Sequence, residues 1–174
     1  MLDEMSLKKY IEWDGKKFVG YVFSGDDEMD VNAPAATSVL VFMVVAVNGS
    51  FKVPVGYFPC VSMSGKEKAN LVRICLEKLE DIDAKVESLV CDGPSAHFTM
   101  LADLGVSLEA ENMKTHFSFG GREKIFCFLD VCHMLKCVRT NFKKVMVMYD
   151  KEGNRIAWEF IEKLAELQEK EGLR

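Results

Sequence analysis

Residues 37–58, TSVLVFMVVAVNGSFKVPVGYF, contain two apolar stretches separated by a strong turn signal. The first stretch, residues 37–47, is β-branched or apolar at nearly every position, which is typical of a strand covered on both faces of a sheet. Asn48-Gly49 is characteristic of a tight hairpin, so residues 51–58 are expected to return antiparallel to the first strand. Pro54 favours a place near the sheet edge for this second strand. The segment therefore predicts an antiparallel hairpin whose first strand is central.

Helices and further strands alternate after this hairpin. Ser64 and Glu67 have the spacing of a capping box, and the apolar residues that follow recur at helical spacing up to Leu79. Later strands are expected at residues 86–90 and 124–129, and later helices at 95–104, 130–141 and 156–170. Upstream of the hairpin we expect a short strand at 17–23 and an acidic loop at 24–36. Residues 109–122 are expected to be a polar excursion.

This order of elements predicts an α/β fold with a mixed sheet flanked by helices. The first strands can pair antiparallel through short turns, whereas the later ones need helical crossovers and therefore run parallel. Among folds with that order, the ribonuclease H-like fold is the leading candidate.

Composition restricts the class of protein further. The chain has 174 residues, 49% of them hydrophobic, with a net charge of −5, which excludes global disorder. The longest apolar run, residues 39–47, is too short to cross a bilayer, and the charged N-terminus is unlike a signal peptide. The six cysteines lie inside apolar runs and are expected to be reduced thiols. We therefore expect a soluble intracellular protein that does not bind membranes.

Seven groups of motifs occur in a fixed order along the chain. They are DEMS at 3–6 with FVGY at 18–21, PVGYF at 54–58, SGKEKANL at 64–71, CDG at 91–93, DVCHMLK at 130–136, WEFI at 158–161 and LQEKEGL at 167–173. In this order and spacing, the sequence resembles the P-element-type transposases, which include the transposase-like THAP-domain proteins of animals. The resemblance covers almost the whole chain.

The resemblance implies a ribonuclease H-like catalytic domain that uses a DDE triad and two divalent metals, Mg²⁺ or Mn²⁺, to cut and join DNA. Asp3 matches the first aspartate of the triad and Asp92 the second. The third acid, a glutamate, has no match in this chain, so whether the chain is an active enzyme stays open. The alternative is a domesticated, catalytically inactive module that contacts DNA or protein.

The resemblance also implies two domains. Residues 1–130 match the ribonuclease H-like core, truncated at its first strand, and residues 131–174 match the start of a helical insertion domain that binds GTP in the P-element enzyme. The sequence lacks a GxxxxGK[S/T] loop, so GTP binding is expected only with the remainder of that domain. Transposon-end DNA as a partner, a nuclear location and a homo-oligomeric full-length parent are implied in the same way.

The residues themselves give independent support for Asp92. Gly93 and Pro94 stop the preceding strand and expose Asp92 at its carboxyl end, where α/β sheets usually place their sites. Asp3 would join it if the first and fourth strands lay side by side, and carboxylate oxygens are the ligands that Mg²⁺ prefers. The alternatives are an ordinary turn residue for Asp92 and a solvated terminal residue for Asp3. Only Met1 and Leu2 precede Asp3, so we expect its strand to be nearly missing.

Two further residues are candidates for supporting the site. Asp130 and His133 are three positions apart at the start of a helix and could form a hydrogen-bonded pair; the alternative is a capping aspartate beside a partly buried histidine. His97 follows Asp92 by five residues and is expected at the surface; the alternative is a place within reach of the same cleft if the intervening turn is tight. A zinc site using Cys132 and His133 is disfavoured, because adjacent residues on a helix point in different directions.

Four basic residues are concentrated in one short segment without acids: Lys136, Arg139, Lys143 and Lys144. The first three have helical spacings of three and four, so they share one face that suits DNA phosphates. The alternative is a solvated face beside an apolar helix stripe.

Overall fold

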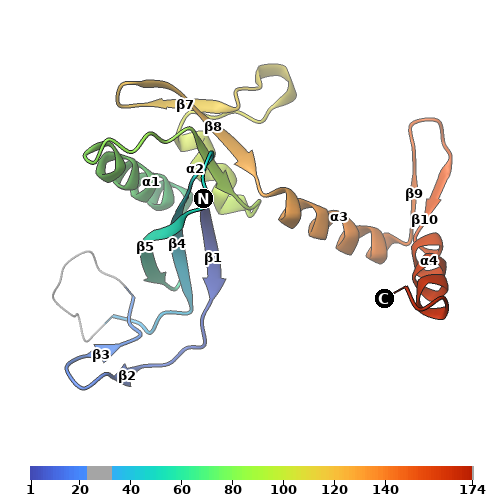
Figure 1. The fold of residues 1–174 in the computed structure, drawn as a ribbon, viewed down its shortest axis with the longest axis horizontal. Helices are drawn as coiled ribbons and strands as arrows, with labels where there is room; N and C mark the ends of the chain where they lie inside the picture. Colours follow the sequence, from blue (N-terminus) through green and yellow to red (C-terminus); the bar gives the residue numbers. More distant parts are fainter. Residues whose placement is uncertain (23–32, 174) are drawn as a thin grey trace. The chain divides into compact units, whose positions relative to one another are not determined.

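The computed structural model describes residues 1–22 and 33–173 and divides the chain into two compact units, Met1–Asp130 and Val131–Arg174 (Figure 1). No helix in the described part of the chain is both long and apolar enough to span a membrane.

The predicted hairpin forms the middle of the first sheet. β1 (Leu2–Ser6), β4 (Ser38–Val45) and β5 (Lys52–Cys60) are arranged in the order β1-β4-β5, with both pairings antiparallel. The prediction of a central strand followed by an antiparallel partner is therefore confirmed. The expectation of a nearly missing first strand is wrong, because β1 has five residues and pairs with β4 over its whole length.

The second sheet contains β6 (Ser88–Cys91), β8 (Arg122–Leu129) and β7 (His116–Phe119), in the order β6-β8-β7. β6 and β8 are parallel, as the crossover argument predicted, and β7 is antiparallel to β8. β1 also lies beside β6, so the two three-stranded sheets adjoin. This adjacency makes the strand that carries Asp3 a neighbour of the strand that Asp92 follows.

The segment 109–122, expected to be a polar excursion, also includes regular elements. It contains a short 3₁₀ helix, η1 (Ala110–Asn112), and strand β7, whose Phe117 is fully buried opposite Ile125 of β8. A single buried aromatic among polar residues gave too weak a periodicity to predict this strand.

Upstream, the predicted strand at 17–23 is much shorter than expected. A small hairpin joins β2 (Glu12–Trp13) to β3 (Phe18–Val19), and the Trp13 and Phe18 rings meet edge to face at 5.1 Å. Phe23 and most of the predicted acidic loop lie outside the described residues.

Two helices cover the core of the first unit. α1 (Gly65–Glu80) begins with the predicted capping box, in which the Ser64 hydroxyl accepts the Glu67 N–H and the Glu67 carboxylate accepts the Ser64 N–H at 2.7 Å. α2 (Ser95–Asp103) packs against α1. The core consists of buried side chains from both sheets, both helices and the segment after α2: Leu2, Leu40, Phe42, Ala69, Val72, Leu76, Leu89, Cys91, Met100, Leu101, Val106, Phe117 and Ile125.

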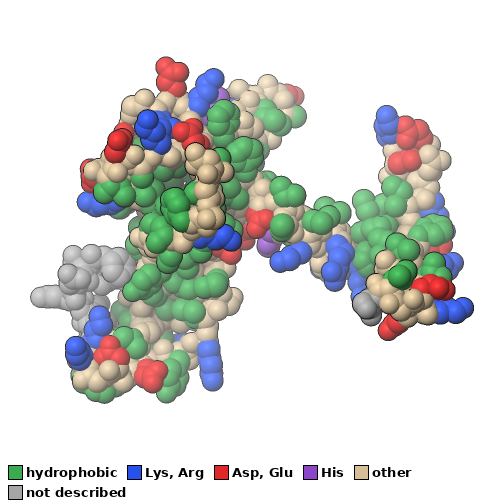
Figure 2. Space-filling model, viewed as in Figure 1, with side chains coloured by type: hydrophobic (Ala, Val, Ile, Leu, Met, Phe, Trp, Pro, Cys, Tyr) green, Lys and Arg blue, Asp and Glu red, His purple; other side chains and the backbone are tan. Residues whose placement is uncertain are grey.

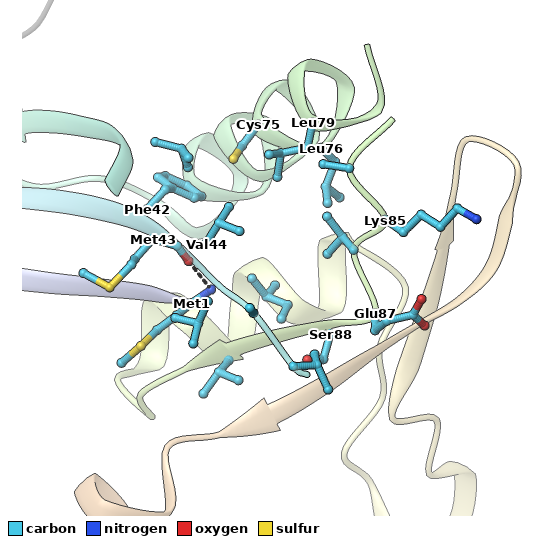
Figure 3. Close-up of a pocket in the computed structure, with 18 of the residues that line it drawn as sticks. Met1, Phe42, Met43, Val44, Cys75, Leu76, Leu79, Lys85, Glu87 and Ser88 are labelled. Atoms are coloured by element: carbon cyan, nitrogen blue, oxygen red, sulfur yellow. Dashed lines mark hydrogen bonds between the residues drawn. The ribbon is translucent and has the colours of Figure 1, made fainter. Parts of the chain in front are cut away.

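An apolar cavity of about 710 Å³ opens beside the start of β1 (Figure 3). The end of β4, the last turns of α1 and the start of β6 line it, with Lys85 and Glu87 as its charged residues. The pairing of β1 with β4 ends at Leu2–Phe42, where the Met1 amine donates to the Met43 carbonyl at 3.0 Å. Neither of the aspartates predicted for catalysis lines this cavity.

The second unit consists of α3 (Val131–Val145), β9 (Val147–Tyr149), β10 (Arg155–Ala157) and α4 (Glu159–Lys170). β9 and β10 form an antiparallel hairpin whose turn is closed by Asp150, which accepts the N–H groups of Glu152 and Asn154. The helix predicted from residue 156 therefore starts later than expected, at Glu159.

Candidate active site

Asp92 occupies the position that the turn signal predicted. β6 ends at Cys91, Asp92 is the next residue, and Pro94 precedes the first turn of α2. The Asp92 side chain is 17% exposed, and its Oδ1 atom lies 2.5 Å from Nδ1 of His97. Oδ1 itself is buried and lacks a well-aligned hydrogen bond despite this short contact. The carboxylate is therefore partly accessible at the carboxyl end of β6.

His97 is fully buried, so the expectation of a surface histidine is wrong. α2 packs against α1 through the face that carries His97, Met100 and Leu101. These residues are three and four positions apart, which places them on one helix face. That spacing is the signal that could have identified His97 as a buried residue.

Lys68 is a second buried polar residue that sequence reasoning missed. It lies on α1, is 2% exposed, and shares the buried helix face with Ala69 and Val72. Its Nζ atom donates to Oε2 of Glu4 at 2.6 Å and lies 3.2 Å from Nε2 of His97. A lysine inside an apolar helical stripe was the available sequence signal.

Together these contacts form a continuous polar chain, which we call the Glu4–Asp92 chain: Glu4, Lys68, His97 and Asp92. Its members come from β1, α1, α2 and the turn after β6, respectively. The Glu4–Asp92 chain of contacts therefore connects the strand that carries Asp3 to the turn that carries Asp92.

Electrostatics favour an ionised carboxylate at the β1 end of this chain. The hydrogen bond from Lys68 lowers the pKa of Glu4 below its ordinary value, against the opposing effect of partial burial. Next to Asp92, at the other end of the Glu4–Asp92 chain, burial raises the pKa of the Cys91 thiol to about 11. Cys91 therefore stays protonated near neutral pH and is a poor nucleophile or metal ligand.

Asp3 lies within β1, paired with Val41, rather than after the end of a short strand. Side chains alternate along a strand, so Asp3 leaves β1 on the face opposite to Glu4 and is exposed. Its Oδ1 accepts the Glu4 N–H at 2.8 Å. Because β1 lies beside β6, the segments that carry Asp3 and Asp92 are neighbours. That the two carboxylates bind the same ions stays a prediction.

Asp130 directly follows β8, as Asp92 directly follows β6. In the parallel pairing Cys91 lies opposite Leu129, and the Asp130 N–H donates to the Cys91 carbonyl at 2.8 Å. Both aspartates therefore lie at the same end of the sheet. His133 is half-buried in the first turn of α3. Its pairing with Asp130 stays a prediction.

The four basic residues predicted to contact phosphates are exposed on α3: Lys136, Arg139, Lys143 and Lys144. Figure 2 shows Lys and Arg side chains along this helix beside apolar ones. The neighbouring Met134, Leu135 and Val138 are themselves exposed, so the described residues do not bury the apolar stripe of α3.

Comparison with known proteins decides the family. Residues 1–105, more than half of the chain, match the family model described as "TNP-like, RNase H N-terminal domain". The chain belongs to this TNP-like family. Residues 132–174 match a second model, "TNP-like, GTP-binding insertion domain". The predicted resemblance and the ribonuclease H-like fold are thus confirmed.

Two proteins named as transposases are similar to this TNP-like chain. The human protein "DNA transposase THAP9" is 28% identical over 180 residues, which cover 98% of this chain and 19% of that protein. The solved "Drosophila P element transposase strand transfer complex" superimposes with a TM-score of 0.68 at 23% identity, over 95% of this chain and 33% of that one. The TNP-like chain therefore spans about a fifth of its human relative and a third of the solved chain.

The donor set of this TNP-like chain suits a hard cation more than zinc. In residues 1–22 and 33–173, no group of three or more His, Cys, Asp or Glu side chains is placed to hold a metal ion. Asp3 and Asp92 offer carboxylate oxygens, which Mg²⁺ accepts in ones and twos while it keeps several waters. The Asp92 side chain is 17% exposed, so part of its carboxylate is accessible to a cation. The two residues therefore fit a partial site for Mg²⁺ or Mn²⁺.

Proposed function

We propose that this chain carries part of the catalytic core of a P-element-type DNA transposase, with Asp3 and Asp92 as two ligands of a divalent metal site for DNA strand cleavage and transfer. One observation carries the proposal. In a TNP-like ribonuclease H chain, an aspartate follows β6, and the adjacent strand β1 holds another.

The chemistry assigns distinct tasks to the metal and to the protein. A bound Mg²⁺ or Mn²⁺ ion stabilises negative charge on the attacking and leaving oxygens of a phosphodiester. Asp3 and Asp92 hold the ion, and the protein groups around Asp92 keep its carboxylate oriented. The matching third acid is absent from this chain, so metal binding is a more direct test of the site than DNA cleavage.

We extend the proposal to DNA and to the second unit. The exposed basic face of α3 offers Lys136, Arg139 and Lys143 at helical spacing to DNA phosphates, and Lys144 lies beside them. Residues 131–174 are the start of the insertion domain, which binds GTP only together with its remainder. The parent protein is a nuclear protein that binds transposon ends, carries a THAP module and forms a homo-oligomer. The inactive interaction module is not favoured by the match to transposases.

The experiment that tests this function measures Mn²⁺ binding to the chain by calorimetry and by electron paramagnetic resonance. Asp92→Asn and Asp3→Asn should each weaken Mn²⁺ binding at least about tenfold, since even an outer-shell partner of a metal ligand contributes that much. Asp81→Asn, at the exposed end of α1, is the matched control and should leave the affinity unchanged. Equal affinities of the wild type and the Asp3→Asn/Asp92→Asn double variant would contradict the proposed site.

A further inference from the structure

The two ends of the His97 ring face partners of opposite hydrogen-bonding type. Nε2 lies 3.2 Å from Nζ of Lys68, an ammonium that can only donate. Nδ1 faces two acceptors of Asp92, Oδ1 at 2.5 Å and the backbone carbonyl at 3.3 Å. Nε2 must therefore accept and Nδ1 must donate. Both contacts specify the same neutral tautomer, with its proton on Nδ1.

We propose that Lys68 and His97 are positioning residues that orient Asp92 for metal binding. Nδ1 of His97 lies in hydrogen-bond range of the Asp92 backbone carbonyl at 3.3 Å and touches Oδ1 at 2.5 Å. This contact keeps Oδ1 on the buried side and leaves Oδ2 as the oxygen that reaches a cation. The orientation of the Asp92 carboxylate is inferred from its contacts with His97. That this orientation serves metal binding rests on the proposed function.

Lys68 fixes the histidine and connects it to β1. Its ammonium donates to Glu4 at 2.6 Å and occupies Nε2, so the ring cannot adopt the other tautomer without placing two donors against each other. Because Glu4 directly follows Asp3 in β1, the same lysine also anchors the strand that carries the other candidate ligand. The Glu4–Asp92 chain thus supports both acid-bearing segments from the buried side of the sheet.

Core packing alone does not explain why Lys68 and His97 occupy buried positions. Burying an ammonium and an imidazole requires each of their polar atoms to find a partner, whereas two apolar side chains of similar volume would fill the space without that requirement. The Glu4–Asp92 chain meets the requirement, and it ends on a partly exposed carboxylate rather than on another core group. Groups that orient a metal ligand in this way commonly change metal affinity by about 10–100-fold when they are removed.

The first test is the tautomer of His97 in the metal-free protein. Long-range ¹H–¹⁵N correlation spectra distinguish Nδ1–H from Nε2–H rings, and the chain has only three histidines to assign. We expect His97 to carry its proton on Nδ1. A neutral ring that carries its proton on Nε2 instead would overturn the proposal whether or not the protein binds metal.

The second test compares two substitutions that each keep one of the two contacts. In His97→Asn the amide N–H lies near the position of Nδ1 and can still donate to Asp92, whereas in His97→Gln the amide reaches only the position of Nε2. We expect Mn²⁺ affinity to stay within about threefold of the wild type in His97→Asn and to fall about 10–100-fold in His97→Gln. Equal losses in both variants would indicate a packing role and overturn the proposal.

The two tests separate this inference from the proposed function. A wild-type chain without Mn²⁺ affinity but with the Nδ1–H tautomer would contradict the metal site and leave the orientation of Asp92 established. Metal binding with an Nε2–H ring would support the site and overturn the role of His97. If either variant fails to fold, the tautomer of the wild-type ring still decides the proposal.

Discussion

Glu4 is the most exposed member of the Glu4–Asp92 chain, with a side chain 28% exposed against 17% for Asp92 and 3% for Lys68. The ion pair joins one accessible carboxylate to an ammonium that has almost no contact with solvent. Without the Glu4 carboxylate, the contact left to the buried Lys68 nitrogen among the described residues is the His97 ring. Removing one partner of a buried ion pair lowers the free energy of unfolding strongly, because the other charge stays buried without its partner. Replacing both partners by apolar side chains costs much less.

The shifted pKa of Glu4 gives this pair a pH dependence. Its pKa in the folded protein lies below the ordinary 4.5, chiefly because Lys68 donates to it. The resulting stabilisation is therefore fully present above pH 4.5 and is lost as the pH falls through the lowered value. Acid should weaken the attachment of β1 to α1.

We predict that Glu4→Gln lowers the free energy of unfolding by about 2 kcal/mol at neutral pH, since it removes a charge-assisted hydrogen bond. The variant should also lose less stability than the wild type as the pH falls to about 3. Urea unfolding across this pH range measures both effects. Glu77→Gln, on the exposed side of α1, serves as the control. An acid dependence of Glu4→Gln identical to that of the wild type would show that the pair contributes nothing to stability.

Among the helices and strands, sequence motifs predicted best those boundaries that depend on contacts between residues close in sequence. The capping box at Ser64 and Glu67 determines the start of α1 through backbone hydrogen bonds close in sequence. β1 was underestimated because its pairing partner β4 lies far away in sequence. β7 was missed although its partner β8 follows only a few residues later. Each buries one face only, so neither shows the continuous apolar pattern that identified β4.

In the candidate site, too, the sequence predicted the residue that depends on local structure and missed those that depend on tertiary contacts. Asp92 could be predicted because the Gly93-Pro94 turn that exposes it is local. Lys68 and His97 could not be connected to it from sequence, because their contacts depend on how α1 crosses α2. The crossing itself depends on one small residue. A Cβ atom at Gly65 would lie 2.5 Å from Cβ of Thr99 and 2.6 Å from the Ala96 carbonyl oxygen.

We predict that Gly65→Ala lowers the free energy of unfolding by about 1–3 kcal/mol, because the added methyl group forces the start of α1 away from α2. The change should also alter the ¹⁵N shifts of the His97 ring, which lies between these helices. Gly121→Ala is the matched control, since a Cβ there meets nothing within 4 Å. Urea unfolding provides the free energies, and an unchanged stability of Gly65→Ala would show that the helices tolerate a wider separation.

At the scale of the whole molecule, the two units differ in how much apolar surface they bury. The core cluster lies entirely in Met1–Asp130. In the described part of Val131–Arg174, the buried side chains are Ala157 and Trp158, and Trp158 meets the Phe142 ring edge to face at 5.4 Å. Several large apolar side chains of α3 and α4 are exposed instead: Leu135, Val138, Phe160, Ile161, Leu164 and Leu167. Buried apolar area is the main source of folding free energy, so the second unit has much less stabilisation of its own.

This difference predicts that the chain does not unfold in one step. The protein has two tryptophans, and the exposed Trp13 can be replaced by Phe so that Trp158 alone reports on the second unit. In Trp13→Phe, we expect the Trp158 fluorescence transition to occur at a lower urea concentration than the loss of the His97 ring signals, which report on the first unit. Replacing Phe142 by Leu removes the ring contact and should shift only the fluorescence transition to still lower urea. Coincident transitions in Trp13→Phe would instead mean that the two units unfold cooperatively, and the weak core of the second unit would then have to be stabilised by the first.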